Sequence, residues 1–143
     1  MLEGLDQFEG KWKLARVIED RRNGFEGRFS GYATFTRSGP LELQYVEEGE
    51  LVYGKQPAMI ATRRYTWRGF EGEDAGKIAV EFEDGRPFHN IALDRLMPDD
   101  DHHCDPDYYQ VSYDFMHWPK WETDWRVLGP SKDYRMSSQY MRA

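Results

Sequence analysis

The sequence has very little cysteine and no long apolar run, and each shortage narrows the class of protein. Cys104 is the single cysteine among 143 residues, which excludes an internal disulfide framework and suits a reducing compartment. No stretch of 18 apolar residues occurs, and the first residues lack the basic and apolar segments of a secretion signal. We therefore expect a cytoplasmic protein that is neither secreted nor inserted in a membrane.

The chain also has fewer positively charged than negatively charged side chains. The chain carries 19 Lys and Arg against 26 Asp and Glu, which gives a formal net charge of −7. Binding to nucleic acid or to anionic lipid depends on an excess of basic side chains. The sequence therefore predicts neither a nucleic-acid partner nor a membrane partner, and the acidic surface favours solubility.

Signatures of common enzymes and metal sites are missing as well. There is no Gly-x-Ser-x-Gly elbow, dinucleotide fingerprint, Cys-x-x-Cys or His-Glu-x-x-His, and the segment 129–133 lacks the spacing of a P-loop. Residues 99–107 gather three metal-ligand types around His102, His103 and Cys104, but adjacent side chains on an extended chain point in opposite directions. We interpret this segment as an acidic loop with one histidine turned into a barrel mouth, and we predict no metal site. The sequence identifies no cofactor.

Aromatic residues are abundant and recur with a period of two. The chain contains five Trp, nine Tyr and eight Phe, residue types that favour pleated, half-buried strands. Large apolar side chains alternate with polar ones between turn residues, as Trp12, Leu14 and Ile18 do. This pattern predicts strands at residues 12–19, 28–36, 41–53 with a bend near Gly49, 59–68, 77–83, 88–96, 108–115, 121–128 and 133–142.

Short links between successive strands favour an antiparallel meander that closes to remove its edges. We therefore predict an all-β fold in which residues 1–143 form a single domain, an up-and-down barrel of about 8–10 strands. A short helix is expected at residues 5–8, before the first strand. A β-sandwich is the alternative architecture.

Several segments carry a resemblance to known families. The run Phe8-Glu9-Gly10-Lys11-Trp12 resembles the Gly-x-Trp opening of lipocalins. The resemblance implies a lipocalin-like (calycin) barrel in which Trp12 plugs the closed end and Arg142, on a late strand, packs across it. Longer stretches resemble a family called domain of unknown function 6314 across nearly the whole chain, and that family has no established activity to carry over. These stretches are segments 27–31, 64–67, 84–88 with His89, 102–109 and 129–134.

Polar residues on the apolar face of a strand are the candidates for a binding site, because an inward charge must be paired or must bind something. Arg16, Arg63 and His89 share faces with large apolar side chains. Two guanidinium groups and an imidazole suit a carboxylate or phosphate, and aromatic walls suit an apolar body. The alternative is that the arginines pair with inward carboxylates or stack on tryptophans. His103 is a further candidate at the mouth, and the expected walls are Tyr65, Trp67, Tyr113 and Trp125.

Three functions remain open at this point. The first is a binding module for a small apolar or aromatic ligand with an anionic group. The second is a lyase-like or isomerase-like enzyme that uses His89 or His103 as acid or base. The third is a protein-interaction domain whose narrow barrel is filled by its own aromatics. The sequence is compatible with a monomer or a homodimer.

Overall fold

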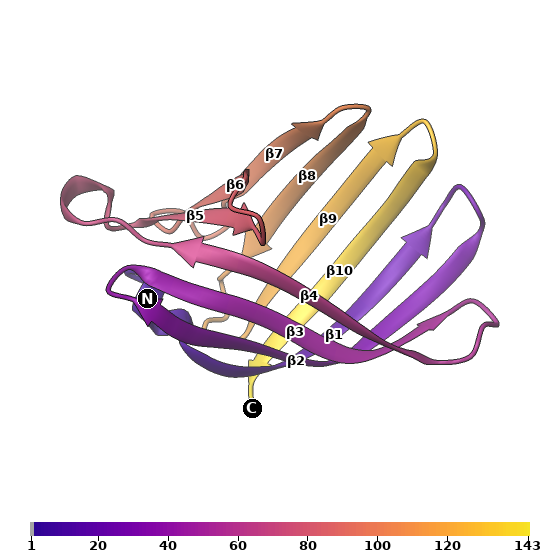
Figure 1. Ribbon diagram of the computed structural model, residues 1–143, viewed down its shortest axis with the longest axis horizontal. Coiled ribbons are helices and arrows are strands. Elements are labelled where there is room, and N and C mark those ends of the chain that lie inside the picture. Colours follow the sequence, from indigo (N-terminus) through magenta and orange to yellow (C-terminus); the bar gives the residue numbers. More distant parts are fainter. Residues whose placement is uncertain (1) are drawn as a thin grey trace.

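Ten antiparallel strands form one sheet in the computed structural model, which describes residues 2–143 (Figure 1). Helical structure is confined to two 3-10 turns, η1 (Leu5–Phe8) and η2 (Gly72–Asp74), and no helix in this described range is long and apolar enough to cross a membrane. The strands are β1 (Gly10–Asp20), β2 (Phe25–Gly39), β3 (Glu42–Tyr53), β4 (Met59–Arg68), β5 (Lys77–Phe82), β6 (Pro87–Ala92), β7 (Asp99–Cys104), β8 (Asp107–Asp114), β9 (Trp121–Gly129) and β10 (Lys132–Arg142).

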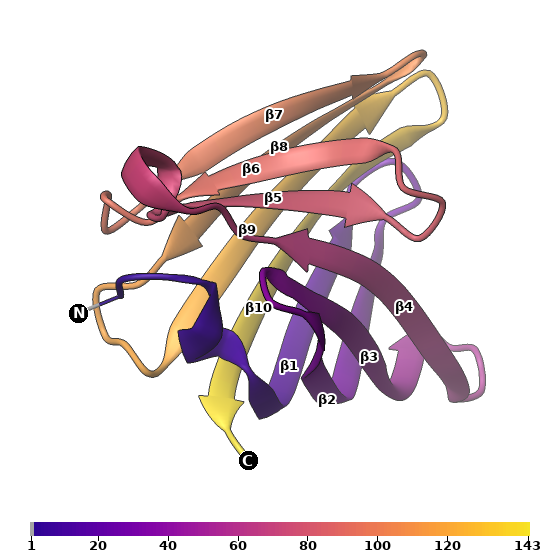
Figure 2. The same cartoon turned by 60° about the vertical axis from the view of Figure 1, so that its left-hand side comes forward.

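The sheet curls into a nearly closed barrel whose break lies in the middle of the chain. Its strand order is β6-β5-β4-β3-β2-β1-β10-β9-β8-β7, so the first and last strands pair with each other while β6 and β7 are the two edges. The views in Figures 1 and 2 show these edges brought close together. Across the seam, the backbone N–H of Asn90 donates to Asp100 Oδ2 at 2.7 Å. The predicted all-β barrel and the short N-terminal helical turn are confirmed.

Two predicted elements differ from the structure. Residues 99–104 form strand β7 instead of an acidic loop, paired with β8 from Asp99↔Ser112 to Cys104↔Asp107. Most of its side chains are exposed, so main-chain pairing with β8 holds this strand in place, and hydrophobic patterning does not mark it. The strand expected at 88–96 is shorter and ends at Ala92.

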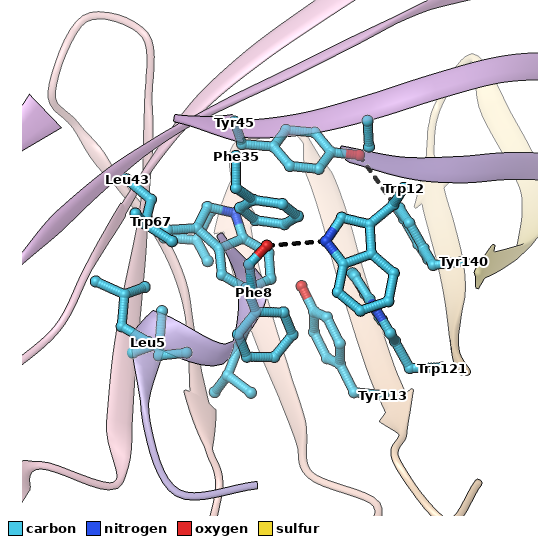
Figure 3. Packing of buried hydrophobic residues seen from close by; sticks show 14 of the residues in the cluster. Leu5, Phe8, Trp12, Phe35, Leu43, Tyr45, Trp67, Tyr113, Trp121 and Tyr140 are labelled. Atoms are coloured by element: carbon cyan, nitrogen blue, oxygen red, sulfur yellow. Dashed lines mark hydrogen bonds between the residues drawn. The ribbon is translucent and has the colours of Figure 1, made fainter. Parts of the chain in front are cut away.

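One end of the barrel is plugged by aromatic packing around Trp12. The indole of Trp12 is fully buried and donates from Nε1 to the carbonyl of Phe8 in η1 at 2.8 Å (Figure 3). The guanidinium carbon of Arg142 lies 3.9 Å from the centroid of the Trp12 ring. Arg142 also donates to the carbonyl of Glu9 at 2.8 Å. Arg142 thus packs across Trp12 and ties the end of β10 to the start of β1.

A pair of glycines allows β2 and β3 to approach closely where β3 is expected to bend. Gly31 and Gly49 are direct partners in the ladder. A Cβ on Gly31 would lie 2.1 Å from the carbonyl oxygen of Glu48, and one on Gly49 would lie 2.8 Å from Cζ of Phe29. Only glycine fits at both positions, and the space beside Gly49 is filled by the Phe29 ring.

Replacing Trp12 with alanine tests the plug. We expect Trp12→Ala to reduce the free energy of unfolding by about 3–5 kcal/mol, because it opens a large cavity among packed rings. Urea unfolding followed by circular dichroism measures the loss. The matched control is Lys13→Ala, whose exposed side chain should change stability by less than about 0.5 kcal/mol. Equal effects of the two substitutions would contradict a structural role for Trp12.

Candidate functional site

An internal cavity of about 180 Å³ lies inside the barrel beyond the plugged end. Most of the side chains around it are aromatic and come from strands on all sides of the barrel. Trp121 and Tyr140 separate the cavity from the plug, with their rings stacked at a centroid distance of 3.7 Å. Phe88 on β6 also lines the cavity and stacks against Trp125, further along β9, at 5.0 Å. Aromatic rings thus form most of the lining, and we call this cavity the slot.

The cavity reaches the surface beside β4. β4 pairs with β5 only over residues 65–68, so residues 59–64 have no partner on β5. Arg63 lies on the part of β4 that β5 does not cover. Its side chain is 50% exposed and also lines the cavity. Tyr65, Tyr109 and Tyr134 are half-buried around the same opening. Arg63 was expected to point into the barrel, and the structure places it at the rim because no strand covers that part of β4.

A buried ion pair lies on the inner face of the sheet and bridges two strands on either side of β2. Arg16 on β1 donates from both terminal nitrogens to the two carboxylate oxygens of Glu47 on β3, at 2.9 Å each. Its Nε donates to the hydroxyl of Ser138 at 2.7 Å. Tyr45 donates to Glu47 at 2.8 Å, and because its single proton is used there, Tyr140 donates to Tyr45 at 2.9 Å (Figure 3). Every polar atom of the Arg16–Glu47 pair thus has a partner.

The pair remains charged although it is buried. Burial opposes the charge of Arg16, but the carboxylate of Glu47 outweighs it and raises the pKa of Arg16. Burial likewise opposes ionisation of Glu47, yet the charge and hydrogen bonds of Arg16 and the hydroxyl of Tyr45 lower the pKa of Glu47 below its usual 4.5. The two charges cancel, so the middle of the cavity has no net charge.

His89 enters the cavity as a neutral imidazole. A register shift between β5 and β6 places Phe88 and His89, which are consecutive, both inside the barrel. The Nε2 atom of His89 lies 2.7 Å from the hydroxyl of Tyr113. Burial, with a smaller contribution from the charge of His102, lowers the pKa of His89 to about 3. Burial also raises the pKa of Tyr113 well above its usual value, so both groups are neutral at pH 7.

Three buried polar atoms on the cavity wall have no hydrogen-bond partner among residues 2–143. They are His89 Nδ1, Trp121 Nε1 and Thr123 Oγ1. A buried polar group without a partner costs about 1–3 kcal/mol, and native proteins contain few of them. All three atoms belong to residues that line the same cavity, which is where a bound molecule or water would supply the missing partners.

Seven of the eight residues proposed from the sequence line this cavity. They are Arg16, Arg63, Tyr65, Trp67, His89, Tyr113 and Trp125. Arg16 does so as the partner of Glu47, which is the alternative in which an inward arginine pairs with an inward carboxylate. A role of these residues in binding a ligand stays a prediction.

The eighth residue, His103, lies outside the barrel. Its ring packs on Tyr108 at 4.4 Å on the exposed face of β7. The neighbouring His102 points inward and lies edge-on to Phe88 at 5.4 Å. Cys104 is exposed at the end of the strand. Within the described chain, no three His, Cys, Asp or Glu side chains are grouped so as to hold a metal ion.

Glu47, Tyr45 and Thr123 belong to the site but are not among the residues proposed from the sequence. The alternation of apolar and polar residues in the sequence gave a signal for two of these three residues. Glu47 has the parity of Leu43 and Tyr45, and Thr123 has the parity of Trp121 and Trp125. The acidic run around Gly49 hid Glu47, because charged residues near a bend are usually solvent-facing.

The comparisons with known proteins agree on the fold. A family model described as "Family of unknown function (DUF6314)" matches residues 8–142. No curated protein matches the chain.

Among solved structures, the S-type phycobiliprotein lyase CPES from Guillardia theta superposes with a TM-score of 0.61 at 9% identity, covering 96% of this chain and 89% of that one. The redesigned β-barrel mFAP1 bound to DFHBI gives a TM-score of 0.52 at 11% identity, covering 99% of this chain and 100% of that one. A de novo designed fluorescence-activating β-barrel gives a TM-score of 0.51 at 13% identity, with 100% of each chain covered. At these identities the likeness shows a shared barrel fold.

Substitution of Glu47 tests the ion pair. We expect Glu47→Gln to reduce the free energy of unfolding by about 3–5 kcal/mol at pH 7, because Arg16 is left as an uncompensated buried charge. The double variant Arg16→Met/Glu47→Leu should recover most of this loss. Urea unfolding measures both, with the exposed neighbour substitution Glu48→Gln as the control.

The same variants test the pH dependence. Because the pKa of Glu47 is lower in the folded protein than its usual 4.5, the carboxylate contributes stability above that pH and loses it as the pH falls through the folded value. The acid-induced loss should therefore shrink in the double variant. An unchanged acid profile would contradict the assignment to Glu47.

Proposed function

Because the chain belongs to the DUF6314 family of unknown function, its activity has to be inferred from the site, and we propose that it binds a small, flat ring molecule inside the barrel. The observation that carries this proposal is the aromatic slot with unpartnered polar atoms on its wall. Stacked walls select flat apolar bodies, and a few polar groups orient them. Barrels of the same fold support the idea, since mFAP1 is a barrel bound to DFHBI.

The size of the cavity limits the ligand. Typical ligand sites measure roughly 300–1,000 Å³, whereas an apolar cavity of about 150 Å³ holds benzene. At about 180 Å³, the site fits a single substituted ring in its present conformation. The rest of the barrel is filled by side chains, as in the interaction-domain alternative, but the remaining slot still admits a ligand.

Arg63, at the rim of the cavity, is the cation that an anionic group of the ligand would contact. Glu47 occupies Arg16, and His89 is neutral, since burial lowers the pKa of His89 to about 3. Arg63 is 3.9 Å from Glu47 and half-exposed. We therefore place any carboxylate or phosphate of the ligand at the opening beside Arg63, with the ring inside.

Binding accounts for the site better than acid–base catalysis. A general acid or base works best when its pKa lies near the working pH, and burial lowers the pKa of His89 to about 3. The other histidine considered for catalysis, His103, lies on the outer surface.

The location of binding can be tested through the tryptophan indole N–H signals. We expect benzoate to shift the signals of Trp67, Trp121 and Trp125, which line the cavity. The signals of Trp12 and of Trp118, whose ring packs on Trp12 in the plug at 5.4 Å, should stay unchanged. Titration followed by ¹H–¹⁵N correlation spectra gives both the site and the affinity. No shift of the three cavity signals with any single-ring compound would overturn the proposed function.

Arg63 provides a second test. Arg63→Ala should weaken benzoate binding by roughly three- to tenfold, the size expected for one partly exposed ion pair, without lowering stability. The matched control is Arg64→Ala, on the adjacent position of the same strand with its side chain facing away from the cavity lining. If Arg63→Ala unfolds the protein while affinity in the folded fraction is unchanged, Arg63 has a structural role instead.

A further inference from the structure

The unpartnered atoms on the cavity wall are mainly hydrogen-bond donors. The indole Nε1–H of Trp121 can only donate, and the hydroxyl of Thr123 carries one proton to donate. Both residues are buried, with 1% and 5% of their surface exposed. Neither atom has a partner in the described protein. Two donors on β9 thus lack an acceptor.

The His89–Tyr113 pair adds a third donor whichever tautomer is present. The two side chains share one hydrogen bond, between Nε2 and the hydroxyl, at 2.7 Å. If Tyr113 donates to Nε2, then Nδ1 of His89 carries the proton and is the unpartnered donor. If Nε2 carries the proton and donates to Tyr113, then the Tyr113 hydroxyl has a proton left over. In both cases three donors surround the cavity.

The residues that carry these donors neighbour one another. Thr123 is the direct ladder partner of Tyr113 on β8. Trp121 lies two residues before Thr123 on the same strand, and its ring stacks with Tyr113 at 6.2 Å. Figure 3 shows Tyr113 and Trp121 next to each other beside the plug. Tyr113, Thr123 and Trp121 are therefore neighbours on β8 and β9, and all of them line the cavity.

The charge around these donors favours a neutral acceptor. The nearest cation, Arg16, is bound by both oxygens of Glu47, and Arg63 lies at the rim. A carboxylate placed at the inner end would lose its hydration without gaining a free cation, which is costly. A carbonyl oxygen accepts two or more hydrogen bonds and carries no charge, so it satisfies the donors at lower cost.

We propose that the buried end of the ligand carries a neutral carbonyl oxygen, which accepts hydrogen bonds from Trp121 Nε1 and Thr123 Oγ1. This inference rests on the proposed function and specifies its ligand class as cyclic or aromatic carbonyl compounds. A charged group, where the ligand has one, lies at the opposite end beside Arg63.

Two probes of similar size and shape test the proposal. Acetophenone has a carbonyl group attached to its ring, and α-methylstyrene has a methylene group in place of the oxygen. We expect acetophenone to bind at least about tenfold more tightly, since α-methylstyrene leaves both donors without partners. We also expect the Trp121 indole proton signal to move downfield with acetophenone and not with α-methylstyrene.

Variants at Thr123 assign the effect to the residue. Thr123→Val keeps the shape and removes the hydroxyl, so it should weaken acetophenone binding by about threefold or more and leave α-methylstyrene unaffected. The control is Thr36→Val, a threonine on the exposed side of β2, which should change neither affinity. Trp121→Phe provides a second donor deletion with the same expected selectivity.

The outcomes separate the two proposals. Binding of neither probe, with no shift of Trp67, Trp121 or Trp125, would overturn the proposed function and this inference with it. Equal affinities for the two probes, or equal losses for both in Thr123→Val, would leave ligand binding standing and overturn the carbonyl assignment. Benzoate binding that depends on Thr123 and not on Arg63 would show that the inner end takes an anion, which also overturns it.

Discussion

The interior depends on the ion pair between Arg16 and Glu47. It joins β1 to β3 over the inner face of β2 and, through Ser138, reaches β10. Because each charge cancels the other and every polar atom of the pair has a partner, the pair holds the strands together without leaving a net charge inside. An arginine free of its carboxylate would make the same cavity a receptor for anions. One acidic residue thus decides the chemical character of the whole slot.

The aromatic residues inside the barrel form two groups that pack differently. Around Trp12 the rings pack without a gap, and the polar edge of that indole is satisfied by Phe8. Beyond the Trp121–Tyr140 stack the rings are spaced so that a slot remains, and polar edges there lack partners. Close packing at the plugged end stabilises the barrel, while the other part of the interior keeps buried polar atoms without partners.

The alternation of apolar and polar residues was sufficient to predict the barrel, the plug and much of the cavity lining. This is because the period of two fixes which side chains face inward. It failed where both faces of a strand are polar. Strand β7 has aspartates and histidines at both parities, so its pairing with β8, and not its sequence, decides that His102 faces inward and His103 outward. The pairing of Arg16 with Glu47 was equally hidden, since it joins strands separated by β2 and depends on the curvature of the closed sheet.

The placement of the seam has a consequence for how the chain folds. Each strand pairs with a strand next to it in sequence, and within residues 2–143 the ladder between β1 and β10 is the one strand pairing that joins the two halves of the sheet. That ladder links Trp12 to Arg142, at opposite ends of the sequence. Contacts so distant in sequence are slow to form. Closure of the barrel therefore depends on the last strand of the chain, because its ladder with β1 makes one continuous sheet of the two halves.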